Sequence, residues 1–289
     1  MIATFVLFLR EGLEACLIVS ILLAALRQLG QPQQMRAVWT GAILAAVGAL
    51  AGGVAIYFTV RAYEDTTFEI VFETITYLLA VIILTGMTFW MQKHSRTLKS
   101  ELVTKASTAG SGFAFGLLAF TSVGREGLET AVFTVAVAFQ TNGILLILGG
   151  LLGILAAVGL CVAIYRLGYH LDYRLFFRVM GVLLLIFAAG LLVNAAHSLQ
   201  ELGWLTFGST PLWSTAHLLS QESEIGHLLH GLFGYTDSPT ALQATLYVLY
   251  LAIAGAIFVR MTRKPILPGV SGSTPATTTA ATPGAAQSA

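Results

Sequence analysis

The residues Arg10-Glu11-Gly12-Leu13-Glu14 occur a second time, letter for letter, as Arg125-Glu126-Gly127-Leu128-Glu129. Each copy lies inside an apolar stretch long enough for a membrane-spanning helix. A charged side chain at the centre of a bilayer is unfavourable by at least about 2.5–3.5 kcal/mol, even on the mildest insertion scales. Six such residues in two matching sets therefore indicate a function, and they predict a pathway for a cation.

The composition places this motif in a membrane protein. Of the 289 residues, 56% are hydrophobic and only 10% are charged, whereas a soluble domain carries about 25% charged residues. The formal net charge is +1, and without a broad basic surface nucleic acid is not an expected partner. Cys16 and Cys161 lie in apolar segments without CxxC spacing, so we expect small core residues and not a redox pair. We expect neither a globular enzyme nor a cleaved signal peptide.

The apolar segments predict an all-α polytopic membrane protein with seven transmembrane helices. A span needs roughly 20 mostly apolar residues. The segments that qualify are 2–27, 37–60, 70–92, 110–139, 143–165, 175–197 and 242–262. Residues 1–262 then form one transmembrane domain. Residues 263–289, rich in Thr, Ala, Pro, Gly and Ser, are predicted to be a disordered tail.

The basic residues predict the orientation of these spans. Twelve of the 15 lysines and arginines flank the helix ends on one side, and only Arg61 falls on the other. The loop 198–241 has no lysine or arginine. Because cytoplasmic loops are enriched in Lys and Arg, the N-terminus is predicted outside and the tail in the cytoplasm.

The repeated motif predicts an inverted repeat. The first span runs inward and the fourth runs outward, so the two motifs run antiparallel. Spans 1–3 and spans 4–6 would then be inverted repeats, with span 7 added. Transporters of this kind bind their substrate at the repeat interface, near the bilayer midplane.

The spacing within the motif predicts a cation site. Residues three and four apart share a helix face, so Arg10, Glu11 and Glu14 lie within one sector. Gly12 and Gly127 point the other way and allow a neighbouring helix to approach closely. Two such faces opposed predict a ring of four carboxylates, which are ligands for hard cations. The ring comprises Glu11, Glu14, Glu126 and Glu129, supported by Arg10 and Arg125 through charge-assisted hydrogen bonds.

Three other interpretations of the motif stay open. A buried lattice of ion pairs would fix helix packing, although it leaves two negative charges without partners. A transporter of another divalent metal, or a proton-coupled cation antiporter, would use the same carboxylates. A haem-binding electron carrier needs axial histidines inside helices, and only His197 lies near a predicted span.

The doubled motif resembles that of the oxidase-dependent iron permeases, the family of the fungal high-affinity iron permease and its bacterial EfeU relatives. Supporting stretches are LTGMTFWM at 84–91, FAAGLL at 187–192 and HGLFGY at 230–235. The resemblance covers residues 1–262 and implies that they form a permease domain. It implies iron as the substrate, usually as ferric ion, and no other cofactor. It also implies an extracytoplasmic iron oxidase or iron donor as partner. The short loops between the spans predict a location in the bacterial cytoplasmic membrane.

Two further acidic residues are candidates for an outer access route. Glu73 begins the third span, one turn deeper than Glu69, and could lead cations inward or stay an interfacial carboxylate in water. The resemblance implies an acidic motif between spans 6 and 7, for which Glu222 in Ser220-Gln221-Glu222-Ser223 is the nearest match.

Overall fold

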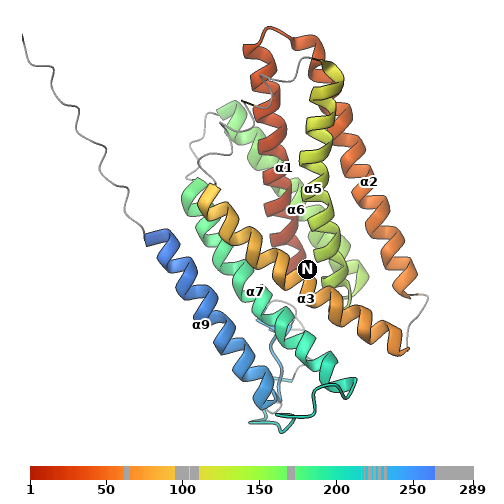
Figure 1. Ribbon diagram of the computed structural model, residues 1–289, viewed down its shortest axis with the longest axis vertical. Coiled ribbons are helices and arrows are strands. Elements are labelled where there is room, and N and C mark those ends of the chain that lie inside the picture. The colour runs from red at the N-terminus through yellow and green to blue at the C-terminus, as the bar shows by residue number, and fades with distance from the viewer. Residues whose placement is uncertain are drawn as a thin grey trace, which may run out of the picture.

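The computed structural model shows a helical protein (Figure 1). It describes residues 1–61, 66–94, 104, 111–167, 173–215, 217, 219, 220, 223, 226, 229, 230 and 233–263. In this part of the chain the only strand pairing is an isolated antiparallel bridge between Pro211 and Thr240. The predicted tail lies outside the described residues, apart from Arg263.

Seven long helices account for the seven apolar segments, and their ends agree with the predicted ends to within a few residues. The helices are α1 (Ile2–Gln28), α2 (Met35–Arg61), α3 (Thr67–His94), α5 (Gly112–Ala138), α6 (Gly143–Leu167), α7 (Tyr173–Glu201) and α9 (Ala241–Arg263). A 3-10 turn at Pro32–Gln34 precedes α2. Five of the seven are long and apolar enough to cross a membrane. The other two, α1 and α5, are equally long but carry the charged motifs.

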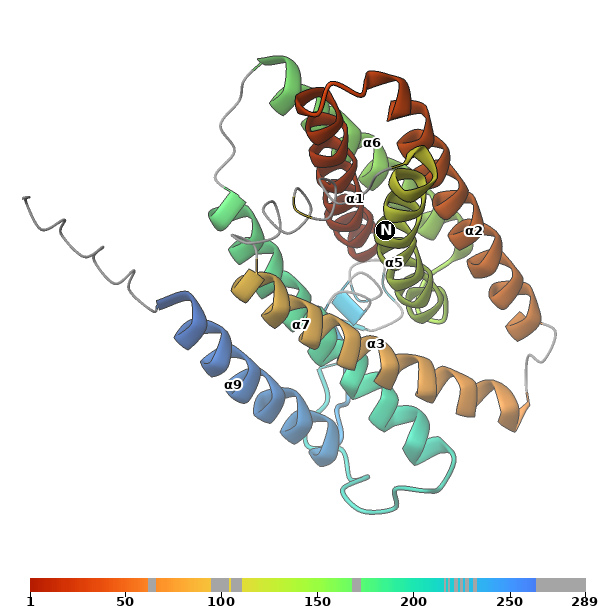
Figure 2. The ribbon, with the colours of Figure 1, turned by 45° about the horizontal axis from the view of Figure 1, so that its top comes forward.

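The helices pack as two sets (Figures 1 and 2). In the first set, α1 packs against α6 and α2 packs against α5, while α1 and α5 contact each other at the centre. In the second set, α7 lies between α3 and α9. The contact of α3 with α5 joins the two sets. The helix pair that carries the motifs is therefore central in the molecule.

Small residues allow the close packing within the first set, as the sequence predicted. A Cβ atom placed on Gly12 would lie 2.8 Å from Cβ of Ala157 in α6. A Cβ atom on Gly127 would lie 2.6 Å from Cβ of Ala49 in α2. Both distances are well below ordinary carbon contacts of about 3.5–4.0 Å. The motif glycines thus hold each motif helix against a partner on the side opposite its carboxylates.

The two closely packed helix pairs, α1–α6 and α2–α5, are both parallel. Along α2 and α5 the contacts advance in register, from Ala45 beside Gly124 to Ala49 beside Gly127, so these helices run in the same direction. The helices α1 and α6 also run in the same direction, because Met1 lies beside Gly149 and Ala157 beside Gly12. Each motif helix therefore has a parallel partner drawn from the other half of the chain.

The described part of the segment between α7 and α9 packs back against α7. Gly234 lies against Gly190, and a Cβ atom on Gly234 would stand 2.5 Å from Cα of Gly190. Gly190 precedes the end of α7 at Glu201 by eleven positions, or about 16 Å at 1.5 Å per residue. Gly234 also has a φ of 65°, which glycine adopts without strain. The two glycines let this segment turn back along the bundle.

Candidate functional site

The two motifs lie near the middle of α1 and α5, where most of their side chains are shielded from solvent. Arg10, Glu11, Glu14 and Glu126 are buried. Glu129 is 16% exposed. Burial of so many charges requires that they compensate one another, because an isolated buried charge is very unfavourable.

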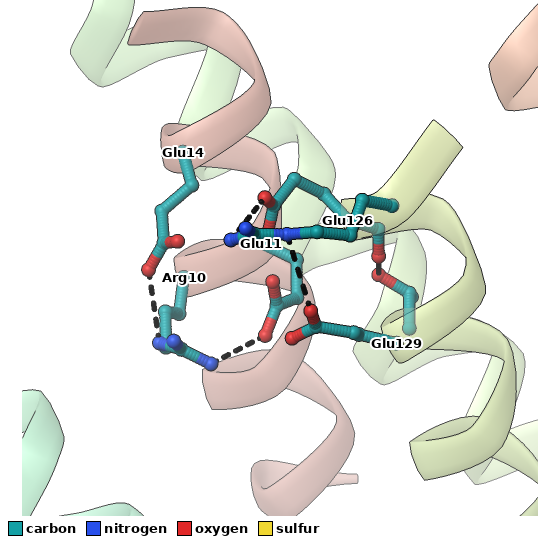
Figure 3. Close-up of polar contacts among 7 residues, drawn as sticks. Arg10, Glu11, Glu14, Glu126 and Glu129 are labelled. Carbon is teal, nitrogen blue, oxygen red and sulfur yellow. Dashed lines mark hydrogen bonds and ion pairs between the residues drawn. The ribbon is translucent and has the colours of Figure 1, made fainter. Parts of the chain in front are cut away.

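Three carboxylates from the two helices meet at one point. Oxygen atoms of Glu11, Glu126 and Glu129 lie within 4.8 Å of one another, and we call these residues the carboxylate group. Figure 3 shows Glu11 on α1 facing Glu126 and Glu129 on α5. Each of the three keeps one buried oxygen, Oε2, without a hydrogen-bond partner in the described part of the chain. The group therefore offers free oxygen atoms to a cation.

Each motif arginine pairs with both glutamates of its own motif. Arg10 lies 2.5 Å from Glu11 Oε1 through Nη1 and 3.1 Å from Glu14 Oε1 through Nε. In the second motif, Arg125 Nη2 lies 3.1 Å from Glu126 Oε1, and its Nε lies 3.4 Å from Glu129 Oε1. The two motifs thus have the same internal pairing, which follows from their one-residue and four-residue spacings.

Three of the four carboxylates that the sequence predicted to form a ring lie close together. Glu14 lies outside the carboxylate group, and Figure 3 shows it paired with Arg10, to one side of the other three carboxylates. Glu129 has the same pairing with its own arginine, so the difference comes from how α1 and α5 cross and not from the pairing of Glu14 with Arg10. As Glu14 is buried, it still contributes negative charge near the group.

The two arginines differ in their surroundings. The Arg10 side chain is 3% exposed, whereas the Arg125 side chain is 49% exposed. The guanidinium carbon of Arg125 also lies 4.9 Å from the ring centre of Trp90 in α3, which is within the range of a cation–π contact. The second motif is therefore the more open one, and it touches the second set of helices.

Apolar side chains separate the carboxylates from both ends of the bundle. On the side where α1 begins, a core cluster includes Leu7, Phe133 and Val137. On the other side, a second cluster includes Leu22 and Phe115. The carboxylates lie between these clusters along α1 and α5, in a polar region closed at each end by buried hydrocarbon.

The candidate outer residues are placed only in part. Glu73 lies near the start of α3, half-buried, and accepts a 2.6 Å hydrogen bond from the Tyr77 hydroxyl. It does not belong to the carboxylate group. Glu222 lies outside the described residues, so its predicted role stays a prediction.

Sequence reasoning did not single out Trp90, which appeared only within the stretch 84–91. A tryptophan in an apolar helix resembles any lipid-facing aromatic residue. Its contact with Arg125 depends on how α3 crosses α5, and no local signal in either helix specifies that crossing.

Seven long, mostly apolar helices in the described part of the chain point to a multi-pass membrane protein. Comparison with known proteins identifies the class. Residues 1–266 match the model of the iron permease FTR1 family, so the chain belongs to this family, which is one of permeases and not of enzymes. The predicted resemblance is confirmed.

Curated relatives are similar over most of their length. The protein named ferrous iron permease EfeU of Yersinia pseudotuberculosis is 37% identical over 266 residues, covering 89% of this chain and 93% of the relative. The protein of the same name from Escherichia coli O6:K15:H31 is 35% identical over 264 residues, covering 90% and 95%. That of Shigella sonnei is 35% identical over 263 residues, covering 89% and 95%. No solved structure matches the chain.

Proposed function

We propose that this chain is an iron permease that moves iron into the cytoplasm through the carboxylate group. Membership of the iron permease family supports iron as the substrate. The observation that supports this site is the meeting of Glu11, Glu126 and Glu129 from two helices within 4.8 Å. Oxygen ligands of this kind suit hard cations. Glu14, Arg10 and Arg125 complete the site as supporting charges.

Charge balance is the physical reason for a cation at this point. The two motifs carry four glutamates and two arginines, which leaves two negative charges in excess when all are ionised. A buried ion-pair lattice would keep that excess without a partner, which is unfavourable in a low-dielectric interior. A bound iron ion compensates it and uses the Oε2 atoms that have no hydrogen-bond partner. We therefore favour the transport site over the lattice.

The proposal includes seven spans, an inverted repeat and an outward N-terminus. The packing supports the repeat. Exchanging α1, α2 and α3 with α5, α6 and α7, respectively, turns the pair α1–α6 into the pair α5–α2. The contact of Gly12 with Ala157 then becomes that of Gly127 with Ala49. The distribution of lysine and arginine supports the orientation. In this scheme the apolar clusters on either side of the carboxylates open alternately.

The proposal extends to the ion and its supply. We keep ferric ion as the species bound, because carboxylate-only ligand sets favour hard cations, although the relatives are named ferrous iron permeases. An extracytoplasmic protein that oxidises or donates iron would then act before the permease. Glu73 and Glu222 are proposed as outer contacts on the way in, and the cytoplasmic membrane of a bacterium is the proposed location.

Uptake by proteoliposomes tests the function. The full chain is reconstituted with an iron-sensitive dye inside, and initial rates are measured with ferric citrate and with ascorbate-reduced iron. We expect Glu11→Gln and Glu126→Gln to reduce uptake by at least about 10-fold, since weakening even an outer partner of a metal ligand has an effect of that size. Glu201→Gln is the matched control, because Glu201 is exposed at the end of α7.

Normal uptake by both carboxylate variants, with the protein inserted in the vesicles, would refute the site. Uptake of reduced iron alone would overturn only the ferric assignment. Competition by manganese or zinc at concentrations equal to iron would favour the broader divalent-metal transporter.

A further inference from the structure

Arg125 already holds the place of a cation at the carboxylate group. Its two nitrogens lie 3.1 Å and 3.4 Å from Oε1 of Glu126 and Glu129. An arriving iron ion carries more charge than a guanidinium and needs the same two carboxylates. Iron at the free Oε2 atoms of these residues would repel the guanidinium on their Oε1 atoms, so binding of iron weakens these ion pairs.

Of the two motif arginines, Arg125 is the one with room to move. Arg10 is enclosed by protein, with a side chain only 3% exposed. About half of the Arg125 side chain is exposed, so protein does not enclose it when the carboxylates are taken. The guanidinium carbon of Arg125 also lies over the ring of Trp90, 4.9 Å from the ring centre.

We propose that Trp90 is a positioning residue that holds Arg125 when the transported ion takes Glu126 and Glu129 from it. This inference rests on the proposed function. The ring attracts a guanidinium more strongly when carboxylates no longer neutralise its charge, because cation–π attraction depends on the net charge and its desolvation. Trp90 therefore stabilises the iron-bound state more than the empty state, and it does so without touching iron.

The contact also crosses between the two sets of helices. Trp90 belongs to α3, which packs with α7, whereas Arg125 belongs to α5, which packs with α2. Transfer of Arg125 from its carboxylates to Trp90 would thus strengthen a contact between the sets at the moment that iron binds. Binding of iron at the second motif would thereby be coupled to the contact between the two sets of helices.

A double-mutant cycle tests this role in proteoliposomes. Trp90→Leu removes the ring, and we expect KM for iron to rise between about 2-fold and 30-fold, the range of exposed to desolvated cation–π contacts, with kcat changed less. Trp90→Phe should restore a large part of the affinity. In the Arg125→Gln background, Trp90→Leu should change KM less than 2-fold. Trp39→Leu is the control, since Trp39 is exposed on α2.

Two results would overturn the inference. One is an equal rise in KM from Trp90→Leu with and without Arg125, which would make Trp90 a packing residue. The other is an unchanged KM for Trp90→Leu. Either result, combined with loss of uptake in Glu126→Gln, would leave the proposed function intact. Normal uptake in both Glu11→Gln and Glu126→Gln would instead refute that function itself.

Discussion

Gly127 offers a direct test of how the fold positions the carboxylates. In Gly127→Ala the new methyl group would start 2.6 Å from Cβ of Ala49. Carbon atoms in contact stand about 3.5–4.0 Å apart, so α2 and α5 must separate by roughly 1 Å. Overpacking of this kind typically costs about 1–3 kcal/mol of stability. The displaced helix carries Glu126 and Glu129 on its opposite face.

Gly124→Ala is the matched control on the same helix. Its methyl group would lie 3.7 Å from Cβ of Ala45, which is an ordinary contact. Alanine favours a helix over glycine by up to about 1 kcal/mol, and this gain is common to both variants. The difference between them therefore isolates the steric effect, which we expect to be about 1–3 kcal/mol against Gly127→Ala.

The assay combines unfolding in detergent with iron uptake in proteoliposomes. We expect a lower unfolding midpoint for Gly127→Ala than for Gly124→Ala. We also expect a KM raised by roughly 10-fold, an effect of the size seen when the support of a metal ligand is lost. If the two variants are equally stable and equally active, the close approach of α2 to α5 does not set the site, and the reasoning fails.

Three further predictions concern other parts of the molecule. Gly234→Ala should destabilise the protein more than Gly203→Ala. Both glycines have φ near 70°, but of the two only Gly234 lies against another backbone segment. Limited proteolysis should therefore cut faster between α7 and α9 in Gly234→Ala. Tyr235→Phe removes two hydrogen bonds of the hydroxyl and should lower the unfolding free energy by about 1–2 kcal/mol, with an unchanged midpoint as the contrary result. Arg10→Gln leaves two buried carboxylates uncompensated and should cost about 3–5 kcal/mol. Arg125→Gln should cost less, because Arg125 is half exposed and Glu129 is partly exposed; equal losses in thermal unfolding would contradict the asymmetry.

The sequence predicted the helices well, because the length of an apolar run is a local property. All seven segments became helices with ends close to those expected. The close approach at Gly12 and Gly127 was also predictable, since helical spacing alone places each glycine opposite its carboxylates. The close approach of Gly234 to Gly190 was not predictable, because these residues are 44 positions apart in the chain.

The repeated motif pointed to the residues of the candidate site, but it did not specify their geometry. Identical motifs gave no reason to expect that Glu14 would stay with Arg10 while Glu129 joined the carboxylate group. The difference arises from the tertiary crossing of α1 and α5, which brings unequal parts of the two motifs face to face. Helical periodicity fixes which side chains share a face, but it does not fix how far along each helix the faces meet.

The broken symmetry has a physical consequence for transport. If both arginines were enclosed as Arg10 is, removing their carboxylates would strand two buried charges and binding of iron would be opposed at both motifs. If both were open, water would reach the carboxylates and screen them, which weakens the site. The protein avoids both extremes. Arg10 is enclosed, whereas Arg125 is half exposed and lies against Trp90. In the proposed mechanism the first motif would form the rigid side of the site, and cations would exchange at the second.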